Sequence, residues 1–145
     1  MVNRENDLAY CAGFFDGEGS IIVCEKKTKA GLVYHVAQAS IQQNDPDVLA
    51  FFRDCVGVGS ISAYVSPRGN RIWRWQASTQ GAGYAMKLLL PYLRLKHAEA
   101  QLAIEFMSHS NGAKTHASAE QLLSRRNLFH KYREIANARK AVSYG

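Results

Sequence analysis

The chain has 145 residues, 47% of them hydrophobic, and this length and composition predict one domain with an ordinary buried core. Its 18 basic and 12 acidic side chains give a formal net charge of +6. The excess is concentrated in residues 55–98, which contain no acidic residue but hold Arg68, Arg71, Arg74, Lys87, Arg94 and Lys96. We expect this block to form a surface for a polyanion, the alternative being an ordinary solvated basic face.

Three cysteines without C-x-x-C spacing predict a reduced intracellular protein and argue against a structural zinc site. The start of the chain has no secretory signal pattern, and no apolar run approaches the roughly 20 residues that span a bilayer. A bacterial or phage cytoplasm and an organelle both stay open as compartments.

The first expected helix begins at Asn3 or Asn6, either of which suits an N-cap, and ends within Gly17-Glu18-Gly19. Asp45-Pro46-Asp47 predicts a later helix start, and Gly57 its end. In chain order we expect that first helix, strands over 20–27 and 32–42, a helix over 45–57, strands over 60–65 and 71–77, and helices over 81–90, 95–108 and 118–140.

This order predicts an α+β fold with an αββαββα core, one four-stranded antiparallel sheet, helices on one of its faces, and extra C-terminal helices. We expect a single domain over residues 1–145, with a core of about 6–107 and a helical tail from about 113 to 145. Apolar stripes are expected in two of the later helices: Leu95, Ala98, Leu102 and Phe106 in one, and Leu122, Leu123, Leu128, Phe129, Tyr132 and Ile135 in the other.

Polar side chains alternate with apolar ones along the expected strands, with Trp73 and Trp75 facing the core. The opposite face offers hydrogen-bond donors and acceptors of the kind that read base edges, although such a face can also simply meet water. The candidate DNA-binding residues are Ile22, Cys24, Lys26, Tyr34, Gln38, Ser40, Gln42, Ser62, Tyr64, Arg68, Arg71, Arg74 and Gln76.

The first helix has two unusual features. Ala9, Gly13 and Gly17 recur every four residues, so they share one helix face that a second backbone can approach closely. Asp16 and Glu18 lie at the negative end of the helix dipole, where a divalent cation is an economical partner.

The segment from Cys11 to Gly19, with its acidic end Asp16-Gly17-Glu18-Gly19, resembles the signature nonapeptide of the LAGLIDADG homing endonucleases. The same element order and sheet are also what this resemblance implies. It further implies that Glu18 and the Gly17 carbonyl bind a metal ion, Mg²⁺, and that Asp16 is less directly involved.

By the same resemblance, a glutamine and a lysine lie around the attacking water, and Gln43 and Lys96 match these positions by context. Gln42 competes with Gln43 because strand register is uncertain by one residue. A plain strand-end amide and a solvated or phosphate-contacting lysine are the alternative interpretations.

One chain carries one motif, and cutting both DNA strands needs two. We therefore expect a homodimer with Ala9, Ala12, Gly13 and Phe14 at its interface, acting on double-stranded DNA. The expected activity is Mg²⁺-dependent, site-specific cleavage of a pseudo-palindromic target of roughly 20 base pairs. A non-cleaving DNA- or RNA-binding protein on the same scaffold (an intron maturase or a regulator) is the alternative, and a structural helix-dimer protein is a third hypothesis.

Overall fold

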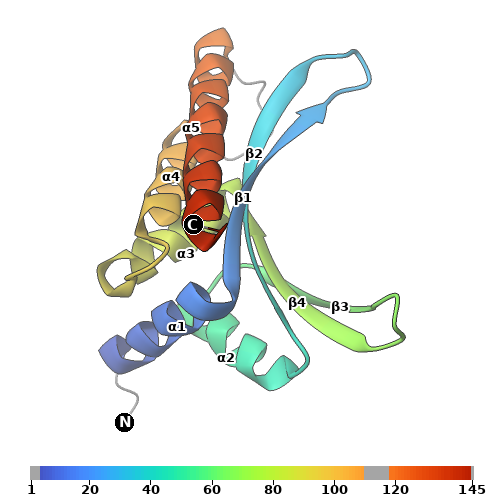
Figure 1. The fold of residues 1–145 in the computed structure, drawn as a ribbon, viewed down its shortest axis with the longest axis vertical. Helices are drawn as coiled ribbons and strands as arrows, with labels where there is room; N and C mark the ends of the chain where they lie inside the picture. The colour runs from blue at the N-terminus through green and yellow to red at the C-terminus, as the bar shows by residue number, and fades with distance from the viewer. Residues whose placement is uncertain (1–3, 110–117, 145) are drawn as a thin grey trace.

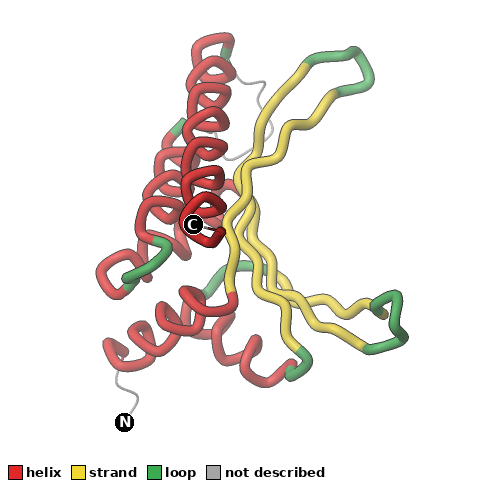
Figure 2. The backbone as a smooth tube through the Cα atoms, viewed as in Figure 1, coloured by secondary structure: helices red, strands yellow, loops and turns green. Residues whose placement is uncertain are grey.

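The computed structural model describes residues 4–109 and 118–144, and its elements follow the predicted order (Figures 1 and 2). The predicted α+β fold class is confirmed. The elements are α1 (Arg4–Glu18), β1 (Gly19–Lys27), β2 (Val33–Gln43), α2 (Pro46–Val56), β3 (Ser60–Val65), β4 (Arg71–Ser78), α3 (Thr79–Leu89), the 3-10 turn η1 (Leu90–Tyr92), α4 (His97–Ser108) and α5 (Ala119–Tyr144).

The four strands form one antiparallel sheet in the order β1-β2-β4-β3, so β2 and β4 are central. The sheet is strongly curved, and the helices lie on its convex side while the concave side is left uncovered (Figure 1). Buried and more exposed residues alternate along parts of β1, β2 and β4, as expected for strands with one face against the helices and one face open.

The main core lies between the helices and the central strands, and three aromatic side chains fill its middle. Phe15 of α1 stacks on Phe52 of α2 with ring centroids 6.2 Å apart, and Phe52 meets Trp75 of β4 edge-on at 4.8 Å. All three are fully buried. The packing of Phe15 fixes α1 against the sheet and so determines where its acidic C-terminal end lies.

Local sequence signals explain the limits of α2. The Asp45 carboxylate accepts a hydrogen bond from the Asp47 backbone N–H at 2.8 Å, which caps the helix as predicted. Gly57 ends it with a φ of 74°, a left-handed conformation that glycine adopts without a side-chain clash.

A second, smaller core holds α5 against the β1–β2 hairpin and α4, with Leu128 packed beside Leu102 and Phe106. Ser118 caps α5 as predicted: its hydroxyl accepts from the Gln121 N–H, while the Gln121 side chain accepts from the Ser118 N–H. His35 of β2 is 5% exposed and stacks on Phe129 at 4.6 Å, and burial lowers its pKa.

Several predicted details were wrong. The helix expected from residue 95 begins at His97, so Leu95 is 55% exposed and Ala98 is also exposed. Leu123 of α5 is 58% exposed. Asn6 lies inside α1 and does not cap it; Asn3 and the loop expected at 110–113 are outside the described residues.

Among the described residues, the structure contains no helix of the length and apolar character that a bilayer crossing requires.

Candidate functional site

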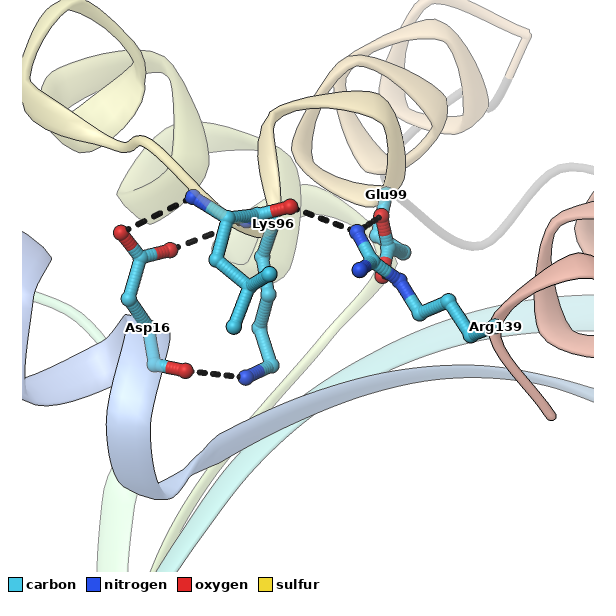
Figure 3. A network of polar contacts seen from close by, with 5 residues as sticks. Asp16, Lys96, Glu99 and Arg139 are labelled. Carbon is cyan, nitrogen blue, oxygen red and sulfur yellow. Dashed lines mark hydrogen bonds and ion pairs between the residues drawn. The ribbon is translucent and has the colours of Figure 1, made fainter. Parts of the chain in front are cut away.

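The C-terminal end of α1 is tied to the segment before α4 through Asp16 (Figure 3). The Asp16 carboxylate accepts three backbone N–H hydrogen bonds, from Arg94 at 2.8 Å, Leu95 at 3.2 Å and Lys96 at 2.9 Å. The Lys96 ammonium also donates to the Asp16 backbone carbonyl. Two segments 80 residues apart in the chain are therefore locked together at the motif.

These contacts correct one expectation and leave another in place. Partial burial alone would raise the pKa of the Asp16 carboxyl, but the three N–H donors and the Lys96 charge outweigh it, so the pKa lies below its ordinary value. The charge of Asp16 is therefore compensated by contacts within the chain, whereas the sequence had suggested a divalent cation as an economical partner of both motif acids. The resemblance implied that Asp16 is less directly involved than Glu18, and its contacts fit that.

Glu18 differs from Asp16 in being exposed at the last position of α1. Its carboxylate makes no hydrogen bond or ion pair within the described part of the chain. An unengaged carboxylate beside the carbonyl end of a helix is a donor set of the kind that Mg²⁺ prefers. Residues 4–109 and 118–144 hold no cluster of three or more His, Cys, Asp or Glu side chains that could bind a metal within one chain.

The structure places Gln42 and Gln43 on opposite faces of the sheet. Gln42 points to the open face of the sheet, where its side-chain oxygen accepts from the Tyr64 hydroxyl at 2.9 Å. Gln43 alternates to the helix side, two residues beyond Ile41, whose partner on β1 is Gly19. Gln43 therefore lies at the same end of the sheet as Glu18.

Lys96 lies in the same region, partly buried beside Asp16. Burial lowers the pKa of its ammonium group, while the carboxylates of Asp16, Glu99 and Glu18 act in the opposite direction. The structure thus brings Glu18, Gln43 and Lys96 to one end of α1. Their catalytic roles stay predictions.

Three polar side chains on the open face of the sheet contact one another. The Arg74 guanidinium lies over the Tyr64 ring, 4.9 Å from its centroid, and Tyr64 in turn donates to Gln42. The Arg74 Nε atom is buried with no hydrogen-bond partner among the described residues. By strand alternation, the other predicted DNA-binding residues on this face are Ile22, Cys24, Lys26, Tyr34, Gln38, Ser40, Ser62 and Gln76.

Two predicted DNA-binding residues lie elsewhere. Arg71 alternates to the helix side of β4, where its guanidinium lies 5.7 Å from the centroid of the Trp73 ring. Arg68 is in the turn between β3 and β4. Three further serines on the open face were not among the candidates. Ser20 and Ser60 fit the alternation within the expected strands, and Ser78 lies one residue beyond the expected end of the fourth strand.

The block without acidic residues does not form one surface. Arg68, Arg71 and Arg74 lie on the β3–β4 hairpin. Lys87 is in the last turn of α3, and Lys96, just before α4, contacts the C-terminal end of α1. The sequence predicted the charge excess, but the folding of the chain distributes it over both sides of the sheet.

The small-residue face of α1 is exposed at Ala9, Gly13 and Gly17, and a Cβ atom added to either glycine would meet nothing within 4 Å. Ala12 was a wrong choice for an interface residue, because it is fully buried in the core of its own chain. Phe14 is partly buried against that core.

An exposed aromatic pair beside this face was missed. Tyr10 is 55% exposed, lies three residues before Gly13 on the same helix, and meets Phe51 of α2 edge-on at 5.6 Å. The two rings line a groove of about 460 Å³ together with Asp7, Asp47 and Val48. A large aromatic residue near a run of small residues is the sequence signal that marks this position.

Comparison with solved structures finds the same fold in DNA-bound endonucleases. The archaeal intron-encoded homing endonuclease I-Vdi141I, complexed with DNA, is 18% identical with a TM-score of 0.72, covering 91% of this chain and 85% of that one. The group I intron-encoded homing endonuclease I-CeuI, also complexed with DNA, is 16% identical with a TM-score of 0.71, covering 91% of this chain and 69% of that one.

A third similar structure is the homing endonuclease I-CvuI, in complex with its target in the presence of Ca. It is 18% identical with a TM-score of 0.62, and the match covers 86% of this chain and 96% of that one. At these identities the likeness establishes the fold. The sequence itself matches the family model of the LAGLIDADG endonucleases over residues 11–111, which is most of the chain. The chain therefore belongs to the LAGLIDADG endonuclease family.

Proposed function

We propose that the protein is a homodimeric, Mg²⁺-dependent, site-specific endonuclease that cuts a pseudo-palindromic DNA duplex of roughly 20 base pairs. The observation that carries this proposal is the end of α1. There, an exposed carboxylate, Glu18, follows an exposed helix face of Ala9, Gly13 and Gly17 that is not covered by any part of the chain that the structure describes.

A second copy of the chain is the occupant that we assign to this face. Without side chains beyond a methyl group, two such helices can approach with their backbones nearly in contact. The exposed rings of Tyr10 and Phe51 extend the apolar surface from α1 onto α2. A two-fold axis through the helix pair brings the two Glu18 residues close together, so that each DNA strand has one motif for its own cleavage.

The concave sheet face is the proposed DNA-binding surface. β2 is 11 residues long, or about 36 Å at the usual rise per residue, and this length matches about ten base pairs of one half-site. The orphaned Nε of Arg74 and the hydroxyl–amide pair of Tyr64 and Gln42 offer donors and acceptors to base edges. Arg68, in the turn at the hairpin end, is assigned to backbone phosphates.

In the proposed reaction, Glu18 and the Gly17 carbonyl would hold the metal ion. When bound there, Mg²⁺ lowers the pKa of a water molecule and neutralises charge on the leaving oxygen. Gln43 orients the attacking water through its amide, and the Lys96 ammonium stabilises the negative charge that develops on the phosphate. Asp16 keeps Lys96 in place and does not contact the reacting atoms.

The test is cleavage of a plasmid library of randomised duplexes with Mg²⁺, comparing the wild type with Glu18→Gln. Cleavage at one family of related sites by the wild type alone is the expected result. Salt-dependent binding without cleavage would instead indicate a maturase or a regulator on this scaffold, and binding indifferent to polyanions would indicate a structural helix dimer.

A further inference from the structure

The C-terminal helix α5 reaches back to the motif end through Arg139 (Figure 3). α5 lies beyond the 11–111 segment that matches the family model. The Arg139 guanidinium donates to both carboxylate oxygens of Glu99, to Oε1 from Nη2 at 2.7 Å and to Oε2 from Nε. Its Nη2 also donates to the backbone carbonyl of Leu95 at 2.6 Å. This two-pronged contact fixes both the distance and the direction between α5 and the start of α4.

Arg139 forms its hydrogen bonds with the segment that carries Lys96. Leu95 precedes Lys96 directly, and Glu99 lies three residues after it, within the first turn of α4. On the other side, Asp16 binds the backbone N–H and the ammonium of Lys96. Lys96 is thus held between α1 and α5, and only the α1 side belongs to the signature motif.

Packing alone does not set the position of the Lys96 side chain. A cavity of about 220 Å³ lies beside it, lined by Lys96, Glu99 and Arg139 together with Ser20 and Tyr132. A flexible side chain next to open space keeps one position only where polar contacts hold it. Glu99 is 6% exposed, so its charge requires a partner in place, and Arg139 supplies it.

We propose that Arg139 is a positioning residue for the cleavage reaction: through Glu99 and the Leu95 carbonyl it fixes the segment that presents Lys96 at the end of α1. The proposal rests on the proposed function, which assigns Lys96 to the scissile phosphate. The proposal thus assigns a role in the reaction to α5, a helix that lies outside the signature motif.

The first experiment uses the protein without DNA or metal and measures how fast an amine-specific acylating reagent modifies Lys96, by mass spectrometry. Arg139→Met should raise this rate severalfold, and Arg139→Lys should give an intermediate rate because lysine keeps the charge but not the fork. Lys140→Met, which removes an exposed charge from the next position of α5, should leave it unchanged.

A destabilised control separates positioning from loose docking of α5. Leu128→Ala weakens the second core without touching Arg139, Glu99 or Lys96. Under native conditions, in which the Leu128→Ala variant stays folded, Lys96 should be labelled at close to the wild-type rate. Equal labelling in Leu128→Ala and Arg139→Met would overturn the proposal. If Arg139→Met does not fold, the double variant Glu99→Gln with Arg139→Gln replaces the buried charges by a neutral amide pair and takes the same test.

The second experiment measures target affinity and the single-turnover cleavage rate with Mg²⁺. Arg139→Met should slow cleavage about tenfold or more while the dissociation constant for the target changes less than about twofold, since a small displacement of a catalytic group has costs of this order. An unchanged cleavage rate in a folded variant contradicts the proposal. If the variants show the expected labelling rates but the wild type cuts no DNA, the proposed function is contradicted and the positioning of Lys96 by Arg139 is not.

Discussion

Asp16 and Glu18 show how two acids in one motif acquire different roles from their partners. The Asp16 carboxylate accepts hydrogen bonds from three backbone N–H groups, whereas the exposed Glu18 carboxylate makes no hydrogen bond or ion pair with the described residues. A saturated carboxylate stabilises structure, while an open one is available to a ligand. Under the proposed function, the difference between a structural Asp16 and a metal-binding Glu18 thus follows from contacts of Asp16 with residues about 80 positions away.

This division predicts opposite results for two conservative substitutions. Asp16→Asn should lower the free energy of unfolding by about 1 to 2 kcal/mol, because charge-assisted hydrogen bonds to backbone N–H groups are lost. Glu18→Gln should leave the stability unchanged and abolish cleavage. Urea denaturation and the plasmid assay measure the two effects, and equal destabilisation by both would contradict the assignment.

The Asp16 effect should also depend on pH. The folded-state pKa lies below the ordinary value of 3.8, so the stabilisation is fully present above that pH and is lost as the pH falls toward the folded pKa. The difference in stability between the wild type and Asp16→Asn should therefore shrink on acidification below 3.8. A difference that stays constant there would show that the charge of Asp16 is not its source.

His35 predicts a second pH dependence, in a different window. Burial lowers its pKa from the ordinary 6.5, and the charged groups that face it are Glu25 of β1 and His130 and Arg126 of α5. Below pH 6.5 the unfolded chain binds the proton more readily, so stability should fall as the pH drops from there.

The matched variant is His35→Phe, which keeps a ring against Phe129 but cannot be protonated. Urea denaturation at about pH 7.5 and about 5.5, on either side of the ordinary histidine pKa, should show a smaller loss of stability in the variant than in the wild type. An equal loss in both proteins would assign the pH dependence to other groups.

At the scale of elements, we expect substitutions of two glycines to have contrasting effects on the stability of the monomer: Gly13 lies within α1, and Gly19 lies at the junction of α1 with β1. Gly13→Leu places its side chain in open space within one chain and replaces a poor helix former, so the monomer should be as stable or more stable by up to about 1 kcal/mol. In a dimer the same side chain separates the two helices. Sedimentation should therefore show monomers, with cleavage lost.

Gly19→Ala is the control within the same motif. Its added Cβ would lie 2.7 Å from Cγ of the fully buried Phe15 ring, so it should destabilise the monomer by about 1 to 3 kcal/mol, as overpacking does. A Gly13→Leu variant that still sediments as a dimer would remove α1 from the interface.

How far the elements could be predicted depended on whether their limits are set locally. Asp45, Pro46 and Gly57 act on the backbone beside them. The helix limits that they predicted nearly match those of α2. The start of α4 was placed too early because Asp16 binds the N–H groups of residues 94–96, a contact that periodicity cannot reveal. Leu95 was therefore assigned to a stripe that begins after it.

The same limit applied to the candidate site. The sequence left the strand register uncertain by one residue, and hydrogen bonding across β2, β3 and β4 shows which of Gln42 and Gln43 lies on each face of the sheet. Arg139 had no local signal at all, because its role follows from the packing of α5 beside α4. Tertiary contacts, rather than propensity, determine these positions.

At the scale of the whole molecule, α1 links the parts of the proposed function. Its buried side carries Phe15 into the core, its bare side is exposed at Gly13, and its last residue is Glu18. The sheet continues directly from it at Gly19, so the position of the open face relative to the motif is fixed by one chain junction. In a two-fold dimer, each half-site should therefore be read by an identical surface at a fixed distance from the cut.

This symmetry makes a prediction about Arg74, whose guanidinium lies over Tyr64 on the open face. Arg74→Ala should relax base preference at one position of each half-site, costing about 1 to 3 kcal/mol of discrimination per position. The two positions should be mirror-related about the centre of the target. Sequencing of sites selected from a randomised duplex library, for the wild type and the variant, measures the change.

Arg133→Ala is the matched control, since Arg133 lies over Phe129 on the helix side, away from the open face. It removes the same charge and should leave the base preferences unaltered. A uniform loss of affinity with Arg74→Ala would reassign Arg74 to a phosphate contact, because backbone contacts weaken all sequences alike. A change at only one position of the whole target would contradict the two-fold arrangement itself, because two identical chains present the same arginine to both half-sites.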